Sequence, residues 1–139
     1  PEAVEYYRNL VWHKYVARPW LNLGRMLHPL TITDVDPVAS RIHAEDTYVP
    51  SAVWQAPDGT VAFVFANGWL SKEIAFRYAF DPADYGLDGD GSTTLYRLTP
   101  HGSPPEVEPH YEKIAPITGR VARRETLPGG AVLILVARK

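Results

Sequence analysis

Apolar residues recur at helical spacing over the first sixteen positions of the chain. The residues at this spacing are Val4, Tyr7, Leu10, Val11 and Tyr15. They predict an amphipathic helix, with proline and glutamate suited to its first turn. Pro19 should end the helix near residue 16 or 17, because the residue before a proline disfavours the α region. Tyr6, Trp12 and Val16 widen the apolar surface beyond a single stripe, which favours a helix with more than one partner.

After Pro19 the pattern changes to short segments with strand character. Residues 51–56 and 60–66 are separated by Pro57, Asp58 and Gly59, which predicts a β-hairpin with a tight turn. Both faces of the second strand are apolar. We therefore expect that strand to be central and covered on both sides.

Further strands are expected at regular spacing. Residues 73–80 alternate, with Ile74, Phe76, Tyr78 and Phe80 facing inward. Other strand-like segments are residues 21–30, 40–48, 93–98 and 131–137. Residues 114–127 contain one or two further strands. Loops are expected at residues 31–40, 81–92 and 101–108, with a tight turn at 128–130. The prediction is an all-β, antiparallel β-sandwich of the Greek-key type, preceded by one N-terminal α-helix.

Composition narrows the classes of protein to which the chain could belong. The chain has 139 residues, no cysteine and a formal net charge of -2. That length suits one domain, and the charge offers no basic footprint for nucleic acid. The longest apolar run, residues 131–137, is too short to span a bilayer. We therefore expect neither nucleic acid nor membrane as a partner.

Three stretches together resemble a known architecture. They are Tyr7-Arg8-Asn9-Leu10-Val11 followed by Arg18-Pro19-Trp20-Leu21 and Gly24-Arg25-Met26-Leu27, the hairpin from Ser51 to Asn67, and Leu127-Pro128-Gly129-Gly130-Ala131-Val132. They resemble the C-terminal β-sandwich region of bacterial glycoside-hydrolase-like (β/α)8-barrel proteins of uncharacterised function. There, the last barrel helix leads into the sandwich.

This resemblance implies a domain organisation and a role. Residues 1–20 would be the end of an upstream domain, and residues 21–139 the β-sandwich domain. The first residue is proline rather than methionine, which agrees with this interpretation. The chain would be a non-catalytic accessory domain of a carbohydrate-active protein, and its partner would be the upstream catalytic domain of the same polypeptide.

The residues give no credible catalytic constellation. The acidic pairs Asp34/Asp36, Glu45/Asp46 and Glu106/Glu108 are expected on solvated loops or strand edges. No G-x-S-x-G nucleophile elbow is present. The parent protein, rather than this segment, would carry any glycoside hydrolysis.

One loop suggests a metal. Asp84, Asp88 and Asp90 alternate with glycines, and carboxylate oxygens are ligands that Ca²⁺ prefers. The loop lacks the closing acid and flanking helices of an EF-hand, so the choice lies between a different calcium site and a turn held by aspartate side chains. The five histidines show no ligand spacing.

Aromatic residues are the best ligand candidates. Sugars stack their apolar faces on exposed rings, and Trp69 and Tyr85 lie among polar neighbours in loops. The alternative function is thus a carbohydrate-binding module that uses these two rings. The competing interpretation is that they fill the core or an interface, as expected for Trp20 and Trp54.

Overall fold

The computed structural model describes residues 2–35, 49–69, 71–102 and 106–139, without the side chains of residues 2–7 and 9. Helix α1 spans Glu2–Val16, and a short helix α2 spans Arg18–Leu21. The predicted end of the first helix is confirmed. The prediction did not include α2, in which Pro19 occupies the first turn, where its missing N–H costs nothing.

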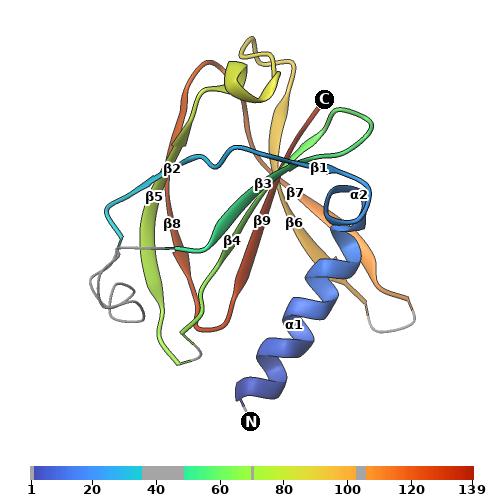
Figure 1. Cartoon of the computed structure of the whole chain (residues 1–139), viewed down its shortest axis with the longest axis vertical. Coiled ribbons are helices and arrows are strands. Elements are labelled where there is room, and N and C mark those ends of the chain that lie inside the picture. The colour runs from blue at the N-terminus through green and yellow to red at the C-terminus, as the bar shows by residue number, and fades with distance from the viewer. Residues whose placement is uncertain (1, 36–48, 70, 103–105) are drawn as a thin grey trace.

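Two antiparallel sheets follow the helices (Figure 1). The larger sheet has the strand order β1-β3-β4-β9-β6-β7. Its strands are β1 (Arg25–Leu27), β3 (Ser51–Gln55), β4 (Val61–Ala66), β9 (Val132–Arg138), β6 (Thr94–His101) and β7 (Glu108–Pro116). The smaller sheet has the order β2-β5-β8, with β2 at Thr31–Thr33, β5 at Ile74–Phe80 and β8 at Val121–Leu127. A 3-10 turn, η2 (Pro82–Tyr85), lies between β5 and β6.

The described residues confirm the predicted fold class, an antiparallel sandwich preceded by a helix. Phe63 and Phe65 of β4 and Phe76 of β5 lie in a core of buried side chains between the two sheets. The alternate side chains of β4 and β9 point to the opposite face, where Ala62 and Val136 join a second buried cluster with α1 and α2. β4 is therefore covered on both sides, as its two apolar faces predicted.

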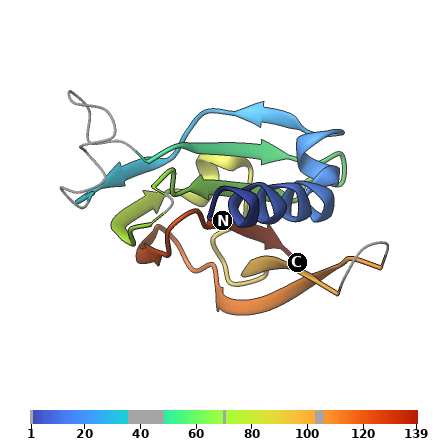
Figure 2. The same cartoon turned by 90° about the horizontal axis from the view of Figure 1, so that it is seen from below.

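The molecule thus has three layers: helix, large sheet and small sheet. Seen from below, α1 lies alongside the large sheet, with β1 and β3 on one side of it and β6 and β7 on the other (Figure 2). Val16, Ala17 and Trp20 carry the contact with the sheet. Burial of these apolar side chains stabilises the position of α2 on the sheet.

Several predicted elements are corrected. Residues 31–33 form β2 rather than part of a loop, because Thr31, Ile32 and Thr33 pair with β5. The segment expected to be extended from residue 21 forms a strand only at Arg25–Leu27. β6 and β7 continue as a pair to His101 and Glu108, beyond the predicted ends. The strand predicted at residues 40–48 lies outside the described residues.

No helix among the described residues is long and apolar enough to cross a membrane.

Candidate functional site

A cleft in the described structure lies at the end of the large sheet beside α2. Its volume is about 530 Å³, within the usual range for small-molecule sites. Its walls come from α2, the β3–β4 turn, the loop after η2, Tyr111 of β7 and the end of β9. Figure 1 shows α2, that turn and residue 139 at the same end of the molecule. Segments far apart in sequence therefore meet around one hollow.

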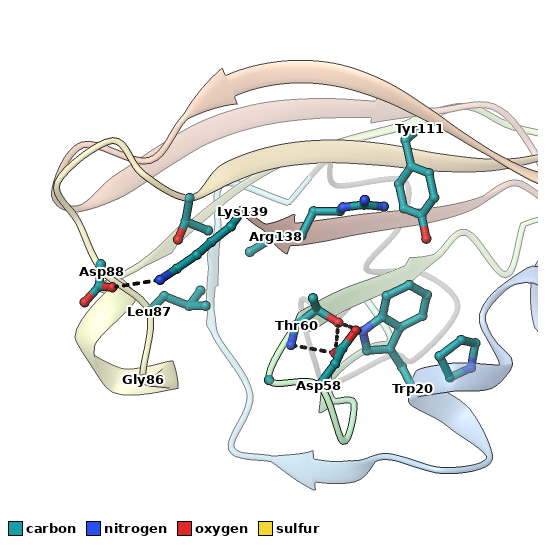
Figure 3. Close-up of a pocket in the computed structure, with 13 residues that line it drawn as sticks. Trp20, Asp58, Thr60, Gly86, Leu87, Asp88, Tyr111, Arg138 and Lys139 are labelled. Carbon is teal, nitrogen blue, oxygen red and sulfur yellow. Dashed lines mark hydrogen bonds and ion pairs between the residues drawn. The ribbon is translucent and has the colours of Figure 1, made fainter.

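Trp20 and the β3–β4 turn form one wall (Figure 3). The indole Nε1 of Trp20 donates a hydrogen bond to Oγ1 of Thr60 at 3.0 Å. The Thr60 hydroxyl donates in turn to Oδ1 of Asp58 at 2.6 Å, and the Thr60 backbone N–H donates to the same oxygen at 3.0 Å. The Thr60 hydroxyl bond, followed by its backbone N–H bond, lowers the pKa of the Asp58 carboxyl. Asp58 therefore presents a carboxylate in a fixed orientation.

Arg138 supplies a positive charge on another side of the cleft. Its guanidinium lies 4.5 Å from the centroid of the Tyr111 ring and 5.8 Å from that of Tyr96. Cation–π contacts of this kind hold the planar guanidinium in place. Among the described residues, Arg138 has no acidic partner at salt-bridge distance. Its donors remain available for a ligand.

The loop after η2 completes the wall. Asp88 lies 3.9 Å from the ammonium of Lys139, and Leu87 adds an apolar side chain beside them (Figure 3). Gly86 ends η2 in the left-handed conformation with φ of 68°, which residues with a Cβ adopt rarely. The chain can therefore turn sharply into the cleft at this point.

The cleft offers a ligand both hydrogen-bond donors and hydrogen-bond acceptors. Its charged lining consists of the acids Asp58 and Asp88 and the bases Arg138 and Lys139, so its formal charges cancel. Carboxylates only accept hydrogen bonds, whereas guanidinium and ammonium groups only donate them. The hydroxyl of Tyr111 points into the same space in Figure 3.

The two predicted sugar-binding aromatics are not part of this cleft. Tyr85 is only 4% exposed: the His28 ring stacks on it at 4.8 Å, and Phe63 and Phe80 meet it edge-on. A ring so covered has no free face for a sugar. Trp69 is half-buried against the inter-sheet core, and Lys72 lies 5.2 Å from its ring centroid.

The three predicted calcium ligands do not converge. Asp88 faces Lys139, and Oδ1 of Asp90 accepts a hydrogen bond from the Ser92 N–H at 2.9 Å. Asp84 lies in the first turn of η2. In the part of the chain that the structure describes, no three His, Cys, Asp or Glu side chains are grouped so that they could hold a metal ion. The calcium site remains a prediction without a gathered ligand set.

Of the predicted calcium ligands only Asp88 lines the cleft, and the described members of the acidic pairs lie apart from it. Asp34 pairs with Arg77 at 3.4 Å on the surface, and Glu106 and Glu108 are exposed beside the β6–β7 loop. Asp36, Glu45 and Asp46 lie outside the described residues.

Sequence reasoning missed the cleft because its parts are separated by more than a hundred positions. Two parts of its lining had a local signal, the β3–β4 turn and the aspartate- and glycine-rich loop that holds Asp88. Arg138 follows an apolar strand and shows no pattern of its own. Comparison with known proteins adds no assignment: no family model matches the chain, and no curated protein or solved structure matches it significantly.

Proposed function

We propose that this chain is a non-catalytic accessory β-sandwich domain of a carbohydrate-active protein and that it supports a catalytic barrel in the same polypeptide. The outer surface of α1 and the α2–β1 segment form the seam with that barrel. We call this surface the α1 face and define it by Leu10, Val11, Tyr15, Leu23 and Met26.

The exposed apolar side chains of the α1 face carry the proposal. These five residues are the large hydrophobic side chains that are exposed in the described structure, and Val11, Leu23 and Met26 are each at least 60% exposed. The register places Met26 opposite Trp54, on the helix side of the large sheet. Large apolar side chains gathered on one side of a molecule mark a surface that another protein covers.

The opposite side of the molecule has a different character. The outer face of the small sheet carries small and polar side chains in cross-strand pairs. These pairs are Ala75↔Thr126, Arg77↔Arg124 and Ala79↔Ala122. That face is suited to solvent. This contrast between the two faces supports one docking surface, the α1 face, rather than exposed apolar residues spread over the whole molecule.

The resemblance to the C-terminal sandwich of glycoside-hydrolase-like barrels supports the identity of the partner. In that arrangement, a helix in the position of α1 belongs to the seam. The exposure of Val11 beside the burial of Val16 agrees with a helix that contacts the sandwich on one side and a further body on the other. The alternative function, sugar binding through Trp69 and Tyr85, has less support because the Tyr85 ring is buried.

The size of the native protein tests this proposal. An antibody raised against the 139-residue chain is used to probe an extract of the cells that make the protein. We expect a band several times larger than 15.5 kDa. The recombinant chain, added to an extract that lacks the protein, serves as the size and proteolysis control. A single native band near 15.5 kDa contradicts the proposal.

A further inference from the structure

We propose that the cleft beside α2 is a binding site for a small, neutral, polyhydroxylated ligand of the monosaccharide class. The site is lined by Asp58, Thr60, Tyr111 and Arg138. It is distinct from the α1 face and from the predicted aromatic positions. The inference stands independently of the accessory role, because a sandwich can bind a ligand with or without a barrel.

The balance of charges selects the ligand class. A ligand carrying a net negative charge meets the carboxylates of Asp58 and Asp88, and a cationic ligand meets Arg138 and Lys139. Either ligand would lie beside two side chains whose charge has the same sign as its own, which disfavours binding. A hydroxyl group donates and accepts at once, so adjacent hydroxyls can donate to a carboxylate and accept from a guanidinium. Alternating polarity around one cleft therefore matches a ring of hydroxyl groups.

The polar groups of the cleft are already held in place. Asp58 is fixed by two hydrogen bonds from Thr60, and Thr60 is fixed by the indole of Trp20, which is itself 3% exposed. Arg138 is held by the faces of two tyrosine rings. Groups fixed before binding lose little conformational entropy when the ligand arrives. This organisation distinguishes the cleft from a chance gathering of surface charges.

The apolar parts of the lining suit the carbon skeleton of a sugar. Leu87 and the ring of Tyr111 contribute apolar surface beside the charged groups. A volume of about 530 Å³ leaves room for a ligand of this size. Small-molecule sites usually combine an apolar lining with a small number of polar groups that point into the site.

The test is a titration of the full 139-residue chain with neutral sugars, followed by ¹⁵N NMR. The probes are glucose, galactose, mannose and xylose, and the charged comparison ligands are glucuronic acid and glucosamine. The indole Nε1–H of Trp20 is the reporter of the site, because it bonds to Thr60 in the cleft wall. We expect at least one neutral sugar to shift this signal saturably, with a Kd on the order of 1 mM.

Two variants locate the binding. Asp58→Asn keeps the turn and its acceptor oxygen but removes the charge, and Arg138→Gln removes the guanidinium. Each should weaken sugar binding about tenfold, because hydrogen bonds to charged groups are the stronger ones. Thermal melts of both variants establish that they remain folded.

Matched controls lie outside the cleft. Asp90 makes the same side-chain bond to the N–H two residues ahead that Asp58 makes, so Asp90→Asn should leave binding unchanged. Arg124 is an exposed strand arginine on the far face of the small sheet, and Arg124→Gln should also bind normally.

Three results overturn the proposal. The first is the absence of saturable binding by every neutral sugar at about 50 mM. The second is binding that Asp58→Asn and Arg138→Gln leave intact, which would place the ligand elsewhere. The third is tighter binding of glucuronic acid or glucosamine than of any neutral sugar, which would show that the balance of charges does not select the ligand.

Discussion

The indole of Trp20 donates a hydrogen bond to the hydroxyl of Thr60 across forty positions of sequence, at 3.0 Å. This bond ties the end of the helical segment to the turn that carries Asp58. It connects the buried cluster between the helices and the large sheet with the cleft, because Trp20 belongs both to that cluster and to the cleft wall. A shift of α2 relative to the large sheet would therefore also move one wall of the cleft.

Removing the Thr60 hydroxyl should destabilise the protein and loosen this link. Thr60→Val leaves the buried indole N–H of Trp20 without its acceptor, at a cost of about 1–3 kcal/mol in the free energy of unfolding. Thr60→Ser keeps the hydroxyl and should lose much less. Urea denaturation of the three proteins measures the difference. Equal stability of the Val and Ser variants would show that the bond contributes nothing.

A Cβ at residue 24 should also destabilise the junction between α2 and β1. A methyl group on Gly24 would collide with the backbone carbonyl oxygens of Trp20 and Gln55. Backbone atoms cannot move aside cheaply, so Gly24→Ala should cost about 1–3 kcal/mol. Gly68→Ala is the control, since nothing lies near the added atom there. Thermal unfolding should separate the two variants clearly; similar melting temperatures would contradict the close approach.

A partly exposed ion pair joins the two sheets. Glu125 of β8 is 8% exposed, and its Oε2 lies 3.3 Å from Nη2 of Arg97 of β6. Arg97→Ala leaves a nearly buried carboxylate without its partner and should cost about 1–3 kcal/mol, less than a fully buried pair because Arg97 is partly solvated.

The exposed pair Arg77–Asp34 provides the comparison. Arg77→Ala should change the free energy of unfolding by no more than about 0.5 kcal/mol. Chemical denaturation of both alanine variants tests the contrast. If Arg77→Ala is the more damaging of the two, the pair between the sheets is not a significant contributor.

Two buried tyrosines should make the protein sensitive to alkali. Burial, reinforced by the charge of Glu125, raises the pKa of the Tyr78 hydroxyl above its ordinary value of 10.0. Burial, and then Asp84, also raises the pKa of Tyr85. Because the folded state favours the neutral forms, their stabilising contribution is complete below pH 10 and is lost as the pH rises through the raised values.

Replacing both rings with phenylalanine should remove this loss. The Tyr78→Phe/Tyr85→Phe protein should lose less stability above pH 10 than the parent chain, while the two behave alike in their pH response below pH 9. Melting temperatures across this pH range provide the measurement. Parallel decline of both proteins in alkali would show that these hydroxyls are not responsible.

The strands that the sequence predicted well are those whose burial alternates strictly. β5 has its four large apolar residues inward and Arg77 outward, as expected. The apolar run of β9 is buried on both faces. Here the local pattern and the tertiary environment agree, so the period of two identified the strands and their inward faces.

The strands that the sequence did not predict form because of their pairing with neighbouring strands. β2 is three residues long and exists because Ile32 pairs with Tyr78 of β5. Pro100 and Pro109 lie opposite each other in the β6–β7 pair, beyond the part of β6 that pairs with β9. Proline is tolerated there because an edge position needs no further N–H donor. Composition alone predicted a loop at this point.

The cleft illustrates the same limit. The turn at Asp58 was predicted, but nothing local indicates that Arg138 would meet it. Their proximity follows from the pairing of β4 with β9, which aligns Val61 with Ala137. A single sequence contains no signal for that register beyond the apolar character of both strands.

Photo-crosslinking from the α1 face tests the central claim most directly. A photoreactive amino acid is placed at Val11, which is 60% exposed, in the protein as its own cells make it. The control places the same group at Thr126, on the outer face of the small sheet. The crosslinked peptides are then identified by mass spectrometry.

The account predicts that position 11 crosslinks to residues of a barrel domain in the same polypeptide and that position 126 does not. A native protein whose position 11 yields no crosslink to a further domain, or yields the same products as position 126, would contradict it.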